Sequence, residues 1–90
     1  MILTPDQKTA IYDVLVSECG APRGSTERSF EFHFPQCTEF RFQGDLGYGG
    51  KVWADGGRVY VSCYREDETP ERVAIIVRAN TALADIVEAV

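Results

Sequence analysis

The stretch SFEFHFPQCTEFRF, residues 29–42, contains all five phenylalanines and constrains the fold more than any other segment. Apolar and polar residues alternate over residues 28–34 and again over 38–43, and PQCT separates the two runs. Alternation with period two is typical of a strand, so the sequence predicts a β-hairpin. The rings that would share one face of this hairpin are Phe30, Phe32, Phe34, Phe40 and Phe42.

Such a row of rings has two interpretations, a platform on which nucleic-acid bases stack or the wall of a core. Phenylalanine has no polar edge that needs water. Burying one ring contributes about 2 kcal/mol, so exposing five would cost a small domain most of its stability. We therefore expect all five rings to lie in the core.

A helix is predicted before this segment, from about residue 5 to residue 19. Thr4 is the expected N-cap, Pro5 occupies the first helical position, and Gln7 completes a capping box. Gly20 provides the stop signal. The following residues, GAPRGSTE, predict a turn-rich loop.

A second hairpin is predicted in KVWADGGRVYVSCYR, because Asp55-Gly56-Gly57 is a strong turn signal. A two-residue turn at either 55–56 or 56–57 produces the same two faces. One face then carries Val52, Val59, Val61 and Cys63. The opposite face carries Trp53, Tyr60, Ser62 and Tyr64.

The C-terminal third is expected to hold an acidic loop, REDETPE, then a strand over RVAIIVR, residues 72–78, and a last helix. Asn80 or Thr81 would cap that helix. Its apolar stripe would be Leu83, Ile86, Val87 and Val90. The predicted fold is α+β in the order α-β-β-β-β-β-α, with an antiparallel, meander-like sheet and both helices on one face.

Length and charge limit the possible functions. Ninety residues predict one domain, residues 1–90. The net charge of −5 opposes direct nucleic-acid binding, which needs clustered Lys and Arg. No apolar run reaches the roughly 20 residues of a membrane span. The N-terminus lacks the basic and apolar regions of a signal peptide, so a cytoplasmic location is expected.

No residue pattern indicates catalysis or a bound metal or cofactor. Cys19, Cys37 and Cys63 are too far apart in sequence for a zinc knuckle, and we expect reduced, mostly buried thiols. His33 and Cys37 are expected at an exposed hairpin, without the third group that a nucleophilic pair requires. The glycine-rich QGDLGYGGK does not match a phosphate loop, because Val52 stands where a Ser or Thr should follow the lysine.

Binding to another protein chain, either a second copy or a target, is the function that the sequence favours. Trp and Tyr on a sheet face are typical of interfaces. The candidate contact residues are Trp53, Tyr60, Tyr64, Tyr48, Glu66, Asp67 and Glu68. The alternative is an acidic nucleic-acid mimic that inhibits a target protein, of the kind carried by phage or mobile elements.

Overall fold

The fold combines helices with one antiparallel sheet. The computed structural model describes residues 1–44, 47–64 and 70–88, apart from the side chains of Tyr64 and Pro70. The described part contains three helices and three strands, in the order α-α-β-β-β-α. Their bounds are α1 Pro5–Cys19, α2 Ser25–His33, β1 Phe40–Gln43, β2 Gly49–Asp55, β3 Arg58–Tyr64 and α3 Pro70–Glu88. The α+β class is confirmed, and the predicted order with five strands is wrong.

Helix α1 begins and ends where the sequence indicates. The Thr4 hydroxyl accepts a hydrogen bond from the Gln7 amide at 3.1 Å, and the Gln7 side chain accepts one from the Thr4 amide at 2.9 Å. This reciprocal pair satisfies two of the N–H groups that a helix start leaves without a partner. Gly20 adopts the left-handed conformation after the last turn and ends the helix.

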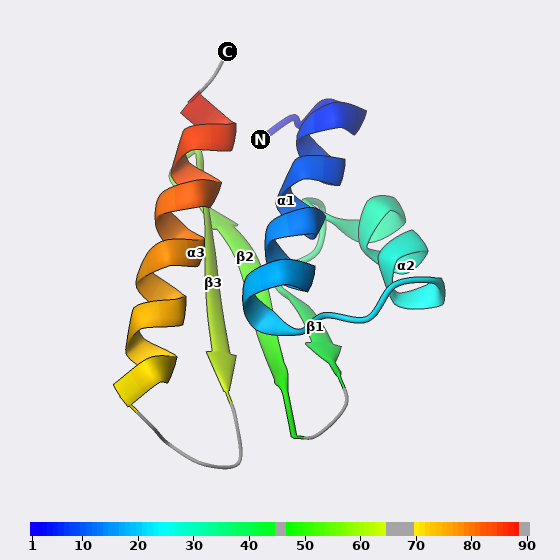
Figure 1. The fold of residues 1–90 in the computed structure, drawn as a ribbon. Coiled ribbons are helices and arrows are strands. Elements are labelled where there is room, and N and C mark those ends of the chain that lie inside the picture. Colours follow the sequence, from blue (N-terminus) through cyan, green and yellow to red (C-terminus); the bar gives the residue numbers. More distant parts are fainter. Residues whose placement is uncertain (45–46, 65–69, 89–90) are drawn as a thin grey trace.

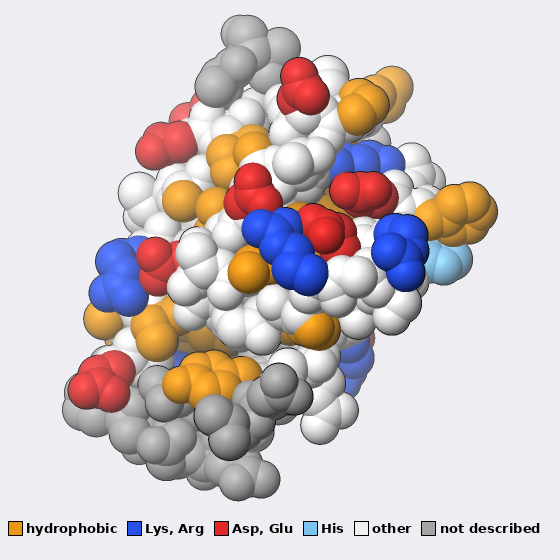
Figure 2. All heavy atoms as spheres, turned by 45° about the vertical axis from the view of Figure 1, so that its right-hand side comes forward, with side chains coloured by type: hydrophobic (Ala, Val, Ile, Leu, Met, Phe, Trp, Pro, Cys, Tyr) orange, Lys and Arg blue, Asp and Glu red, His pale blue; other side chains and the backbone are white. Residues whose placement is uncertain are grey.

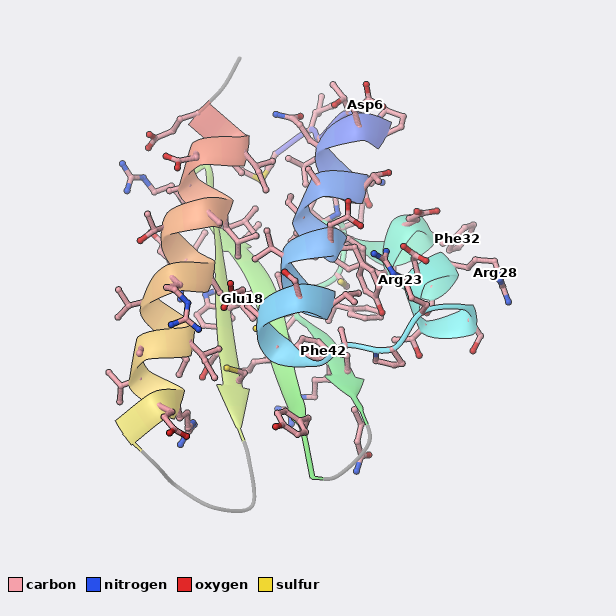
Figure 3. The ribbon with its side chains drawn as sticks, in the orientation of Figure 1. Asp6, Glu18, Arg23, Arg28, Phe32 and Phe42 are labelled. Atoms are coloured by element: carbon pink, nitrogen blue, oxygen red, sulfur yellow. The ribbon has the colours of Figure 1, made fainter. Side chains whose placement is uncertain are left out.

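The first predicted hairpin is wrong over its N-terminal run, because Ser25–His33 forms helix α2. The spacing of Phe30, Phe32 and Phe34 fits a strand, with period two, and also a helix, with period 3.6. In a helix, the first and third rings are four residues apart and share a face, whereas the middle ring points away. Phe30 and Phe34 are buried and stack with their ring centroids 4.9 Å apart. Phe32 is 81% exposed and projects from α2 into solvent (Figure 3).

The two remaining phenylalanines lie on β1 and face the core. Phe42 is buried, and half-buried Phe40 contacts the Phe30 ring edge-on at 5.4 Å. The Phe42 ring occupies space beside Gly50, where an added Cβ would come within 2.7 Å of the ring. Glycine at position 50 therefore allows the ring to pack directly on the backbone of β2.

The hairpin of β2 and β3 is confirmed. Asp55 pairs with Arg58 across a two-residue turn, and Gly56 and Gly57 take φ values of 59° and 79°. Positive φ at both central positions is the geometry that suits the twist of a hairpin. The register sends Val52, Val59, Val61 and Cys63 to the buried face, as the alternation predicts.

The predicted strand over residues 72–78 is wrong, because this segment belongs to α3. In the helix, Ala79 and Leu83 lie in the core, whereas Val73 and Val77 are exposed. The row of apolar residues is therefore the border of a helical stripe, not a strand buried on both faces. Pro70 and Glu71, which were expected in the acidic loop, belong to α3, and residues 65–69 lie outside the described residues.

The helices and the sheet form two layers. Figure 1 shows α1 and α3 side by side over one face of the sheet, whose strand order is β1-β2-β3, with α2 beside α1. Residues of all these elements meet in one core, which contains Leu3, Ile11, Tyr12, Leu15, Cys19, Ala21, Phe30, Phe34, Phe42, Val52, Val59, Val61, Cys63, Ala79 and Leu83. Within the described part of the chain, no helix is long and apolar enough to cross a membrane.

Asn80 connects α3 to the edge of the sheet. Its side-chain amide accepts a hydrogen bond from the Val61 N–H and donates one to the Val61 carbonyl, both at 2.9 Å. It also donates to the Ile76 carbonyl at 2.9 Å. The expectation that Asn80 or Thr81 caps the helix is wrong, since both lie inside α3. Asn80 instead satisfies backbone groups that would otherwise be unpaired in the interior.

Truncation of the two phenylalanines of α2 should change the stability of the fold to very different extents. Phe30→Ala should lower the free energy of unfolding by about 3–5 kcal/mol, because it removes a fully buried ring. Phe32→Ala should change it by less than about 0.5 kcal/mol, because that ring is in solvent. Urea denaturation of both variants checks this. Equal losses would contradict the helix and support the hairpin.

Asn80→Ala should destabilise the protein by about 2 kcal/mol, because the N–H and carbonyl of buried Val61 both lose their partner. Thr81→Ala is the matched control, since the exposed Thr81 hydroxyl donates to the Val77 carbonyl of the same helix. Its effect should stay within about 0.5 kcal/mol. Thermal unfolding of both variants gives the comparison, and similar melting temperatures would contradict the role assigned to Asn80.

Candidate functional site

Trp53 and Tyr60 form a stacked pair on the face of the sheet opposite the helices. They are cross-strand partners in β2 and β3, and their rings lie 5.9 Å apart with an interplanar angle of 30°. The Lys51 ammonium lies 5.4 Å from the centre of the Trp53 ring. Contacts of this kind hold aromatic rings in place on an open sheet.

Polar and charged side chains surround the pair. Glu39 forms ion pairs with Arg41 at 2.9 Å and with Lys51 at 3.8 Å. Arg41 and Lys51, together with Gly50 and Ser62, line a shallow hollow of about 220 Å³. We call the surface made by Arg41, Lys51, Trp53, Tyr60 and Ser62 the aromatic face.

No described helix covers the aromatic face, because both long helices lie on the other side of the sheet. The side chains of β2 and β3 alternate, and those that meet α1 and α3 are the buried Val52, Val59 and Val61. Figure 1 places α1 and α3 over that side alone. Trp53 and Tyr60 are each half-buried, and their rings contact one another.

A groove of about 480 Å³ continues the aromatic face around the β3 edge to α3. Tyr60 belongs to both surfaces. The groove is mostly apolar, and Val77, which is 59% exposed, borders it. The residues that line it are Arg58, Val59, Tyr60, Ile76, Val77, Asn80, Thr81, Ala84 and Asp85.

The structure describes the side chain of one of the other predicted contact residues, Tyr48. Tyr48 packs against Gly20 at the end of α1. Tyr64 is the last residue of β3 and pairs with Gly49, but its side chain lies outside the described residues. The acidic run Glu66, Asp67 and Glu68 also lies outside them.

The structure places His33 and Cys37 at the C-terminal end of α2. The Cys37 amide donates to the His33 carbonyl at 3.2 Å, which is a turn at the end of α2. The His33 ring packs edge-on against Phe32 at 5.0 Å. In this described segment, no hydrogen bond joins the His33 imidazole to the Cys37 thiol.

The buried Cys19 thiol is a poor nucleophile. Cys19, at the end of α1, and Cys63, on β3, are both buried. A hydrogen bond with Cys63, together with burial, raises the pKa of the Cys19 thiol. The thiol is therefore protonated at neutral pH, and reactivity would need the thiolate. Burial likewise raises the pKa of Tyr12, whose hydroxyl donates to the Pro22 carbonyl.

Neither metal-ligand geometry nor similarity to known proteins assigns a function. Among the residues with described positions, no group of three or more His, Cys, Asp or Glu side chains is placed to hold a metal ion. No protein-family model matches the chain, and neither curated proteins nor solved structures give a match. The geometry of the aromatic face is therefore the basis for a functional proposal.

Sequence reasoning missed the groove, because it assigned residues 72–78 to a strand. With helical spacing, Val73 and Val77 fall on one side of α3, because they are four residues apart. Ala84 lies on the same side, two turns after Val77. Helical periodicity was the signal that could have identified this apolar border. The basic pair Arg41 and Lys51 was also missed, since it depends on the register of β1 against β2.

Proposed function

We propose that the chain is a non-enzymatic protein-binding module that docks another protein chain on the aromatic face. The stacked Trp53–Tyr60 pair, presented on a sheet face that no described helix covers, is the observation that carries this proposal. Trp and Tyr bury large ring areas while the NH or OH stays wet. They are enriched among the residues that dominate binding energy.

The surroundings of the pair also suit an interface. Arg41, Lys51 and Ser62 provide a polar border beside the rings, and the groove supplies a concave apolar surface on the other side. A hydrophobic centre with a polar rim is the common anatomy of reversible protein interfaces. The proposal includes a cytoplasmic setting, in which Cys19, Cys37 and Cys63 stay reduced.

Charge arrangement favours this proposal over the acidic mimic. A mimic of nucleic acid needs a continuous acidic surface. Figure 2 shows acidic and basic side chains interspersed on the face made by α1 and α2. Carboxylates that form ion pairs with Arg or Lys are Asp13, Glu18, Glu27, Glu39 and Glu88.

The double variant Trp53→Ala/Tyr60→Ala should weaken target binding at least about tenfold, because it removes both anchors. Immobilised parent and variant proteins, incubated with extract of the native cells, provide the measurement through quantified capture. Phe32→Ala is the matched control, since it removes an exposed ring from α2, away from the aromatic face. Its capture should equal that of the parent.

Salt dependence separates the two functions. Capture through aromatic contacts should persist at high ionic strength, whereas capture by an acidic mimic should fall steeply. Circular dichroism of the double variant verifies that it is folded. A folded double variant that retains full capture, together with loss of capture when Glu66, Asp67 and Glu68 are changed to Gln, would contradict the proposal and support the mimic.

A further inference from the structure

The two edges of the sheet differ in how far side chains satisfy their outward backbone N–H and carbonyl groups. In a two-residue hairpin the flanking pair is hydrogen-bonded, so alternate residues of β3 direct their backbone groups away from β2. Val61 and Cys63 are two such residues. Asn80 pairs with both backbone groups of Val61, and the Arg72 guanidinium donates to the Cys63 carbonyl at 2.7 Å. Side chains of α3 therefore cover much of the β3 edge.

The β1 edge has no such cover. The same alternation directs Gly50 and Val52 toward β1, where they pair with Phe42 and Phe40. Arg41 consequently directs its N–H and carbonyl away from the sheet. Among the residues that the structure describes, none forms a hydrogen bond with these two groups of Arg41, and the side chain is 75% exposed. Open edges of this kind are templates for a further strand.

The charges along this edge are self-complementary. Glu39, Phe40 and Arg41 follow one another with opposite charges on either side of an aromatic ring. If a second copy approaches in antiparallel orientation about a twofold axis at Phe40, each Glu39 faces the Arg41 of the other copy. Opposite charges at directly facing positions stabilise an antiparallel pair. Symmetry makes the same contact twice.

We propose that two copies of this chain pair through their β1 edges in this register, forming a continuous six-stranded sheet. Two hydrogen-bonded residue pairs, each of Glu39 with Arg41, would contribute about four backbone hydrogen bonds. Gln43 would face Cys37, which lies in the turn after α2, so the pairing ends there. A register centred on Arg41 would place two guanidinium groups opposite each other and is disfavoured.

This self-association does not use the Trp53–Tyr60 pair, the anchors proposed for target binding. The added strand lies in the plane of the sheet, so the aromatic faces of both copies stay open on the same side. A dimer would therefore present two Trp53–Tyr60 pairs at once. Trp53→Ala/Tyr60→Ala should leave the dimer intact, which separates failure of this inference from failure of the proposed binding function.

Proline substitution tests the backbone contact directly. The parent should sediment as a reversible monomer and dimer of the 10.0 kDa chain. Arg41→Pro removes an outward N–H, which edge strands tolerate, and should weaken dimerisation at least about tenfold. Gln43→Pro is the matched control on the same edge, outside the proposed pairing, and should retain the dimer. A parent that stays monomeric at every concentration, or unchanged dimerisation of folded Arg41→Pro, would overturn the inference.

Exchange of the charges at Glu39 and Arg41 tests whether the partner is a second copy of the chain. This test does not depend on a proline substitution. Glu39→Arg alone places Arg opposite Arg, and Arg41→Glu alone places Glu opposite Glu, so each variant should be monomeric. An equimolar mixture should restore a dimer, because every facing pair is then Arg with Glu. Sedimentation equilibrium of the two variants and their mixture measures this. A mixture that remains monomeric, or single variants that dimerise like the parent, would refute pairing between copies at this edge.

Discussion

The two-residue turn at Gly56 and Gly57 fixes which side chains of the sheet are buried and which form the aromatic face. It pairs Asp55 with Arg58 and thereby sets the register of β2 against β3. A shift of one residue would exchange the faces of a strand. Because Val59 and Val61 must meet α1 and α3, the register that builds the core also places Trp53 beside Tyr60 on the other side. Core packing and the candidate binding surface therefore depend on the same turn.

Local signals predicted α1 and the β2–β3 hairpin, because a capping box and a glycine turn act over a few residues. These local signals did not distinguish a helix from a strand where the spacing of apolar residues fits both the helical period and the strand period. Phe30 and Phe34 satisfy a helical face as well as a strand, and tertiary packing decides. Thr-Pro-Glu at 69–71 repeats the Thr-Pro-Asp that begins α1, and this repeat was the available clue to α3.

Edge protection and surface charge limit the surfaces through which the molecule can associate with another chain. Asn80 occupies the β3 edge with hydrogen bonds that another strand would otherwise make. Ion pairs such as Arg23 with Asp13 and Arg78 with Glu18 set basic charges beside acidic ones on the helices, so the acidic charge at these places is not continuous. Among the described residues, the two surfaces that we propose for association are the aromatic face with its groove, for a target, and the β1 edge, for a second copy.

Acrylamide quenching of tryptophan fluorescence measures whether the aromatic face is open. Trp53 is the only tryptophan, so the emission reports on this face alone. We expect emission from a partly hydrated indole that acrylamide quenches readily in the folded protein and less readily once a target is bound. A blue-shifted emission that acrylamide does not quench in the isolated protein would show that Trp53 is buried and that the aromatic face is closed.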